Sequence, residues 1–142
     1  MMKISARNTL AGSVTKVIKG AVNSEVDLTL NGGDKVVAII TNDSVAGLGI
    51  KEGTHAYAIL KASWVILAKG LEAKKISARN VLAGTVTKVH EGAVNNEIVL
   101  KLNGGNELTS VITRESSHSL GLKEGDAAFA VFKASSVIIG VD

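Results

Sequence analysis

Donor side chains recur in this 142-residue chain in the same order, 72 residues apart. Most are arginine, lysine, serine or threonine, which offer cationic and hydroxyl hydrogen-bond donors. Gathered in one place, such groups have the chemistry of an oxyanion site. Polar residues present in both copies include Ser5/Ser77, Arg7/Arg79, Asn8/Asn80, Asn23/Asn95, Glu25/Glu97, Thr41/Thr113, Ser44/Ser116, Lys61/Lys133 and Ser63/Ser135.

The string Lys-Ala-Ser, at residues 61–63 and 133–135, lies between two predicted strands, which leaves its backbone N–H groups free to face a ligand. One arginine and one lysine together neutralise a dianion, which makes its burial feasible. A site made only of donors has no acceptor for a ligand proton. It therefore favours molybdate, tungstate or sulfate over protonated phosphate.

Each of these residues also has a purely structural explanation. A serine caps a turn, an arginine sits solvated on a strand, a threonine begins a helix, and a polar pair fixes strand register. These explanations apply to Ser5, Arg7, Thr41, Ser63, Asn23 and Glu25. Spacing alone therefore indicates an anion site without establishing it.

The elements that must position these residues also form a repeat. Residues 3–67 align with residues 75–139 without a gap, and about 38 of about 65 positions are identical. We expect two domains, residues 1–69 and 70–142, joined around Ala68–Lys74. Units this small bury little surface alone, so the two should pack together, share strands or oligomerise.

Within a unit the hydrophobic period is mostly two, which is typical of strands. Asn31–Asp34 has the composition of a hairpin turn, and a short helix should begin at Thr41 or Asn42 and end at Gly49. The pattern predicts an all-β fold with one short helix per unit, arranged as two tandem OB-like barrels. The predicted strands are Leu10–Ile18, Val22–Leu30, Val36–Ile40, Ala56–Leu60 and Trp64–Leu67.

Composition narrows the function. The net charge of +3 is too small for a general polyanion binder, and the absence of cysteine excludes disulfides and thiolate sites. No protein ligands for a metal ion are expected, because the three histidines lack ligand spacing. No apolar stretch suits a membrane span or a signal peptide, so we expect a cytoplasmic protein with no membrane partner.

The sequence bears on three other classes of function. Only 3% of residues are aromatic, which argues against a nucleic-acid-binding OB module, because such modules stack bases on aromatic rings. No histidine and nucleophile recur together, and Glu25 and Glu97 lack a partner carboxylate, so no enzyme or catalytic residue is expected. A ligand-sensing regulatory module that acts through a partner protein remains the alternative.

Several motifs in combination resemble the molybdate-binding Mop family, the molbindins, and in particular their tandem two-domain members. The resemblance covers nearly all of both units. Since the chain shows neither a helix-turn-helix nor a P-loop, it implies a free-standing binder that stores or buffers molybdate, or tungstate. The motifs are Ser5-Ala6-Arg7-Asn8, Gly20-Ala21-Val22-Asn23, Ile40-Thr41 and Lys61-Ala62-Ser63, each repeated 72 residues later.

The resemblance also implies an assembly. Tandem members form homotrimers that enclose oxyanions between subunits. The main site would join Ser5 and Arg7 of one subunit with residues of its neighbour, namely Thr41, Lys61, Ala62 and Ser63. The second unit would supply Ser77, Arg79, Thr113, Lys133, Ala134 and Ser135. Asn8 and Asn80 are expected to hold the arginine-bearing segment in place.

A second type of site near the threefold axis would use two turns, Gly20-Ala21-Val22-Asn23 and Gly92-Ala93-Val94-Asn95. The copies differ beside this site, where Lys19 corresponds to Glu91. A carboxylate disfavours a neighbouring anion, so the axial sites should differ in strength. Trp64 corresponds to Ser136, and we expect Trp64 to pack near the joint between the units.

Overall fold

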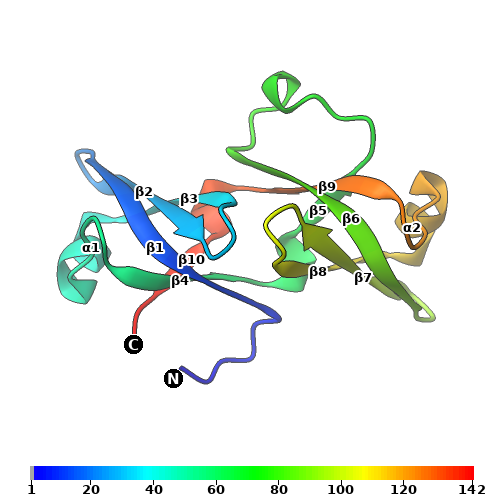
Figure 1. Ribbon diagram of the computed structural model, residues 1–142, viewed down its shortest axis with the longest axis horizontal. Helices are drawn as coiled ribbons and strands as arrows, with labels where there is room; N and C mark the ends of the chain where they lie inside the picture. Colours follow the sequence, from blue (N-terminus) through cyan, green and yellow to red (C-terminus); the bar gives the residue numbers. More distant parts are fainter. Residues whose placement is uncertain (1) are drawn as a thin grey trace.

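The computed structural model describes residues 2–142, which form two similar units of strands with one helix each (Figure 1). The first repeat contains β1 Asn8–Lys19, β2 Asn23–Leu30, β3 Lys35–Thr41, α1 Asn42–Leu48, β4 His55–Leu60, the 3₁₀ turn η1 Ala62–Trp64 and β5 Ile66–Ala68. The second contains β6 Asn80–Glu91, β7 Asn95–Leu102, β8 Glu107–Thr113, α2 Arg114–Leu120, β9 Ala127–Phe132, the 3₁₀ turn η3 Ala134–Ser136 and β10 Ile138–Gly140. A third 3₁₀ turn, η2 Ala73–Lys75, lies in the connection. The predicted order of strands and helix is confirmed.

The strands form because alternate side chains reach the core. In β2, Val26, Leu28 and Leu30 are buried at every second position, as a half-buried strand requires. Thr41 begins α1 by accepting a hydrogen bond from the Ser44 N–H at 3.1 Å, and Gly49 ends it in the left-handed region with φ of 65°. Both predicted helix boundaries are therefore confirmed.

The repeats exchange their last strands. One sheet has the order β10-β4-β1-β2-β3, and the other has the order β5-β9-β6-β7-β8. Each OB-like half therefore takes four strands from one repeat and its fifth from the other. The division into residues 1–69 and 70–142 stays a prediction about the repeats, since neither sheet is built from one of those ranges alone.

Two buried asparagines fasten the repeats to each other. The Asn8 amide donates to the Thr109 carbonyl at 2.8 Å and accepts from the Thr109 N–H at 2.7 Å. Asn80 makes the same pair of bonds to Val37, both at 2.8 Å. Each side chain thus satisfies the backbone of the other repeat's edge strand, which an exposed edge otherwise leaves unpaired. These contacts agree with the expectation that Asn8 and Asn80 hold the arginine-bearing segments.

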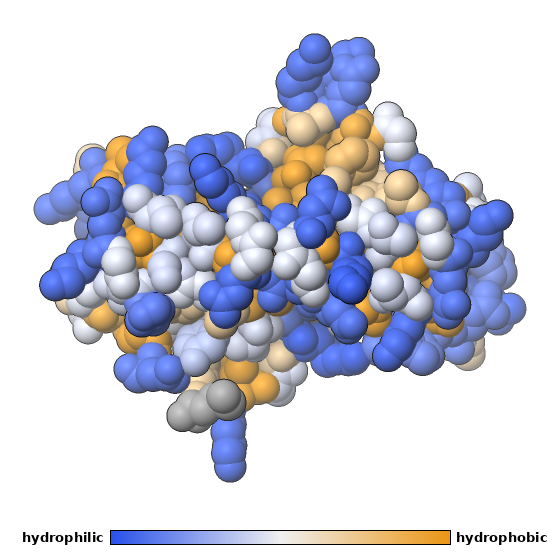
Figure 2. All heavy atoms as spheres, viewed as in Figure 1, coloured by the Kyte–Doolittle hydropathy of each residue, from blue (hydrophilic) through white to orange (hydrophobic). Residues whose placement is uncertain are grey.

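The exchange places α1 and α2 at opposite ends of the long axis, while the connection that carries η2 projects from one side (Figure 1). Figure 2 shows apolar side chains gathered beneath that projection. Ile66 and Ile76, which are 60% and 38% exposed, line one cavity together. Among residues 2–142, no helix is long and apolar enough to span a membrane.

Candidate functional site

The donor residues of the first repeat meet in one cavity of about 470 Å³, which we call the Lys61 pocket. Val111 and Ile138 of the second repeat complete its wall. The strand that precedes the site, β4, ends one residue before Lys61, so the sheet fixes where the lysine begins. The donors that line the pocket are Ser5, Arg7, Lys61, Ala62 and Ser63.

The second repeat forms a matching cavity of about 400 Å³, the Lys133 pocket. Here Ile39 and Ile66 of the first repeat complete the wall. The equivalent donors line it, namely Ser77, Arg79, Lys133, Ala134 and Ser135. One chain therefore brings ten of the predicted residues together in two like groups of five.

The Lys-Ala-Ser segment forms a single 3₁₀ turn in both repeats. In η1 the Trp64 N–H donates to the Lys61 carbonyl at 3.0 Å and the Val65 N–H donates to the Ala62 carbonyl at 3.3 Å. The first N–H groups of such a turn have no partner within it. The backbone N–H groups of Ala62 and Ser63 therefore have no partner within the turn.

Each arginine forms an ion pair with a glutamate of the other repeat. Arg7 donates from Nη1 and Nη2 to both oxygens of Glu97, at 2.9 and 2.7 Å. Arg79 Nη1 lies 2.9 Å from Glu25 Oε1. The hydrogen bond from Arg7 lowers the pKa of Glu97, and that from Arg79 lowers the pKa of Glu25. Both carboxylates are therefore charged at neutral pH.

Sequence reasoning missed these pairs, because it considered Glu25 only as a residue that fixes strand register. The available signal was that Arg and Glu are retained together in both repeats. A guanidinium has five N–H donors, so Glu97 leaves some donors of Arg7 free. Because both arginine side chains are about half exposed, at 52% and 53%, the pairs contribute little to stability. Their consequence is to fix the two arginines beside the pockets.

The lysines differ from the arginines because they have no such partner. Among residues 2–142, neither Lys61 nor Lys133 forms a salt bridge. The Lys61 ammonium instead lies over the Trp64 ring, 5.5 Å from its centroid. Trp64 is 40% exposed and lines the Lys61 pocket beside Val111 of the second repeat. It is thus near the joint between the repeats, as expected, and also part of the pocket wall.

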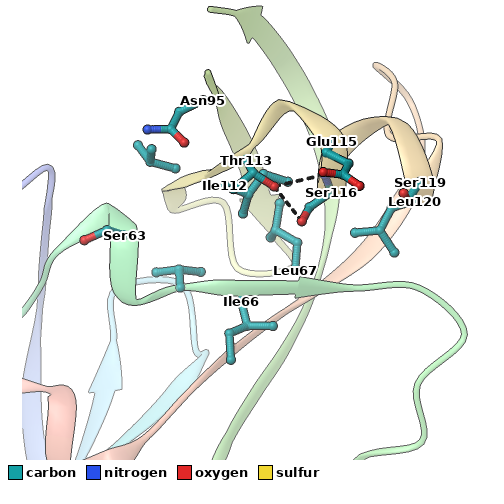
Figure 3. Close-up of a pocket in the computed structure, with 12 residues that line it drawn as sticks. Ser63, Ile66, Leu67, Asn95, Ile112, Thr113, Glu115, Ser116, Ser119 and Leu120 are labelled. Carbon is teal, nitrogen blue, oxygen red and sulfur yellow. Dashed lines mark hydrogen bonds between the residues drawn. The ribbon is translucent and has the colours of Figure 1, made fainter. Parts of the chain in front are cut away.

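The two predicted threonines lie elsewhere. Thr41 is not among the described residues that line the Lys61 pocket; its hydroxyl caps α1 and donates to Ser44 Oγ at 2.9 Å. Thr113 lines a larger cavity of about 670 Å³ that also includes Ser63 and Asn95. Figure 3 shows Ser63 on the opposite side of this hollow from Thr113. Within one chain, Ser63 therefore shares a cavity with the threonine of the other repeat.

The Gly-Ala-Val-Asn turns form no common site within one chain. The Asn42 N–H donates to the Val22 carbonyl and the Arg114 N–H donates to the Val94 carbonyl, which ties each turn to the start of its own helix. Since α1 and α2 lie at opposite ends of the molecule, so do the turns (Figure 1). Beside the second turn, Glu91 Oε1 lies 3.2 Å from His118 Nε2.

The comparison with known families identifies the repeats. The model of the TOBE domain matches residues 4–67 and 76–139. The chain belongs to the TOBE domain family. The two TOBE repeats coincide with the internal repeat, and the predicted tandem OB-like architecture is confirmed.

Individual relatives agree with the predicted relationship to the Mop family. Molybdenum-pterin-binding protein MopA of Rhodobacter capsulatus is 45% identical over 140 residues, which are 99% of this chain and 53% of that protein. The chain thus spans about half the length of this relative. Molybdenum-pterin-binding protein 3 of Clostridium pasteurianum is 52% identical over 66 residues, 46% of this chain and 97% of its own length. It therefore corresponds to a single TOBE repeat.

A solved structure extends the likeness to the whole chain. The cytoplasmic molybdate-binding protein ModG, in a form with molybdate bound, superposes with a TM-score of 0.93 at 49% identity. The match covers 99% of this chain and 100% of the ModG chain. The likeness therefore includes both TOBE repeats and their arrangement in one chain. These relatives are named as binding proteins and not as enzymes.

Proposed function

We propose that this chain binds molybdate, or tungstate, as an oxyanion at the Lys61 and Lys133 pockets. The observation that carries the proposal is the gathering of the same five donors in both repeats of a chain that superposes with a molybdate-binding protein over its full length. The metal would be held through its oxygens, with no metal ion coordinated by the protein. No catalytic step is part of this function.

Capture depends on replacing the hydration shell of the oxyanion. In the Lys61 pocket the ammonium group, the hydroxyls of Ser5 and Ser63 and the backbone of η1 supply donors. Hydrogen bonds from charged donors are shorter and stronger than neutral ones. Arg7 would add the donors that Glu97 leaves free. The Lys133 pocket would act in the same way.

The charge of one pocket supports a site shared with another subunit. Lys61 and Arg7 carry two positive charges, but Glu97 offsets one of them, so a dianion would not be neutralised by one chain alone. Exposed apolar residues border the pockets, including Trp64 at 40% and Ile138 at 48%. A homotrimer that covers them would add neutral hydroxyl donors, such as Thr41 or Thr113 from a neighbour. It would also exclude water, which strengthens the attraction between the oxyanion and the remaining positive charge of the pocket. The Gly20–Asn23 and Gly92–Asn95 turns of three copies would form the axial sites.

The proposed role is storage or homeostasis of molybdate inside the cell. A ligand held between subunits stabilises the assembly by mass action. A rise in molybdate concentration would thus occupy the sites and stabilise the oligomer, and a fall in concentration would release the ion. Neither a nucleic acid nor a membrane is needed for this role.

Isothermal titration of the full chain with molybdate, tungstate, sulfate and phosphate tests the proposal. We expect binding of molybdate and tungstate, and weaker or no binding of phosphate. The double variant Lys61→Ala with Lys133→Ala should bind molybdate at least tenfold more weakly, because each substitution removes a charged donor. Lys51→Ala with Lys123→Ala removes the same charge outside both pockets and is the matched control. Absence of heat with every oxyanion would refute the function.

A further inference from the structure

The Lys61 and Lys133 pockets contain the same donors but have different neighbours. Among the positions that differ between them are Trp64 against Ser136 and Asp27 against Val99. Both differences lie next to a charged donor of a pocket. They therefore bear on how strongly each pocket attracts an anion.

Trp64 acts on the lysine of the first repeat. Its ring lies under the Lys61 ammonium, 5.5 Å from centroid to Nζ, a distance typical of a cation–π contact. The contact holds a flexible side chain in the pocket before a ligand arrives, which reduces the entropy lost on binding. Trp64 also lines a smaller cavity with Lys133 and Ser136. Among the described residues, however, Lys61 is the one lysine placed over the ring.

Asp27 acts on the arginine of the second repeat. Arg79 pairs with Glu25, and Asp27 lies two residues further along β2 on the same face. Arg7 pairs with Glu97, and the equivalent position holds Val99. The lysines opposite these positions, Lys16 and Lys88, are the same in both repeats, so they do not cancel the difference. The Lys133 pocket thus has one more carboxyl beside its arginine.

The surroundings of Asp27 show that this carboxyl is poorly compensated. Its Oδ1 is buried and has no hydrogen-bond partner among residues 2–142. Burial, together with hydrogen bonding to Glu25, raises the pKa of Asp27. Lys16 faces it from β1, whereas the residue opposite on β3 is the apolar Val37. Arg79 makes one contact with Glu25, whereas Arg7 makes two with Glu97.

We propose that the two pockets bind the oxyanion with different affinity, the Lys61 pocket more tightly, and that Trp64 and Asp27 set the difference. The inference rests on the proposed function, since it concerns the same pockets. A chain of this kind would fill its sites in order as molybdate rises. It would bind over a wider concentration range than one with two equal sites.

The inference can be tested by exchanging the residues that differ between equivalent positions of the two repeats. Apart from any axial site, molybdate titrations of the full chain should resolve two classes of pocket whose affinities differ roughly threefold to tenfold. Lys61→Ala should remove the tighter class and Lys133→Ala the weaker. Asp27→Val should strengthen the weaker class, and Val99→Asp should weaken the tighter one. Trp64→Ser should weaken the tighter class, and Ser136→Trp should strengthen the weaker.

Trp64 is the chain's one tryptophan, so its fluorescence gives a second readout. The fluorescence change should saturate with the tighter class in the calorimetric titration. A single class of equal sites that none of the four exchanges alters would overturn the inference and leave molybdate binding intact. The same would follow if Asp27→Val weakened binding. No heat with any oxyanion would instead overturn the proposed function.

Discussion

The residues of the donor pockets and the Gly-Ala-Val-Asn turns are equally well repeated in the sequence, but the fold brings only the pocket residues together. Each pocket is assembled within one chain from five equivalent donors. The turns lie at opposite ends, and Val22 and Val94 at their tips are 71% and 72% exposed. Repetition of a motif therefore indicates that it is constrained, but not whether one chain completes the site.

The largest effect should come from the arginines. Arg7→Ala with Arg79→Ala should weaken molybdate binding tenfold or more, since each pocket loses a cationic donor, while circular dichroism shows a folded chain. Arg114→Ala removes one arginine outside both pockets and should leave binding unchanged. An unaltered stoichiometry and affinity in the double variant would show that the pockets do not use these side chains.

The glutamate partners separate two roles for the arginines. If the guanidinium contacts the ion, Glu25→Gln with Glu97→Gln should strengthen binding, because a competing carboxylate is removed. If the ion pair merely positions the arginine, the same double variant should weaken binding. The sign of the change in molybdate affinity in the double glutamate variant therefore distinguishes direct contact with the ion from positioning of the arginine.

The next largest effect, on the free energy of unfolding, is expected at Asn8 and Asn80, which directly follow Arg7 and Arg79. Asn8→Ala should lower the free energy of unfolding by about 1–3 kcal/mol, because the Thr109 N–H and carbonyl lose their partner. Asn80→Ala should act likewise through Val37. Urea unfolding followed by circular dichroism measures both, with Asn103→Ala in the second hairpin turn as a control. A change within 0.5 kcal/mol of zero, about that of an ordinary surface substitution, would contradict the expectation.

A smaller effect is expected at the turns. Val22→Ser with Val94→Ser should change the free energy of unfolding of an isolated chain by less than about 0.5 kcal/mol, because both side chains are exposed. If three copies bring the turns together, the same variant should weaken assembly. Sedimentation with and without molybdate measures this. An assembly that the substitutions leave unchanged would place the turns outside the interface.

The smallest expected effect is on how the stability of the chain depends on pH at the two Arg–Glu ion pairs. The pKa values of Glu25 and Glu97 are lowered in the folded chain, so the stabilisation from both ion pairs is present above the ordinary glutamate pKa. It is lost as the pH falls through the lowered values. Stability measured by urea unfolding from pH 7 to pH 3 should therefore decline less in Glu25→Gln with Glu97→Gln than in the unsubstituted chain. Equal declines would show that the pairs do not persist in solution.

Local signals in the sequence were sufficient to predict the strands and the short helices. Alternation predicted β2, and the Thr41 cap and Gly49 end of α1 were both predicted from residue type. These features depend on residues close in the chain, where backbone geometry and side-chain chemistry act directly. The donor residues were named by resemblance, which divided them between two subunits. That Ser5 and Arg7 lie in one cavity with Lys61 of the same chain was not predicted, and the exchanged strands explain why each cavity takes wall residues from the other repeat.

The sequence by itself determined that there are two like units, which donors they share, and where Trp64 and Asp27 break the likeness. Only the tertiary structure decided that β5 and β10 change places, that Arg7 and Arg79 pair with Glu97 and Glu25, and that Thr113 lines a cavity together with Ser63 of the other repeat. The physical reason is distance along the chain. The two repeats carry nearly the same apolar pattern, so either could complete either sheet, and packing across the whole molecule selects the exchanged partner.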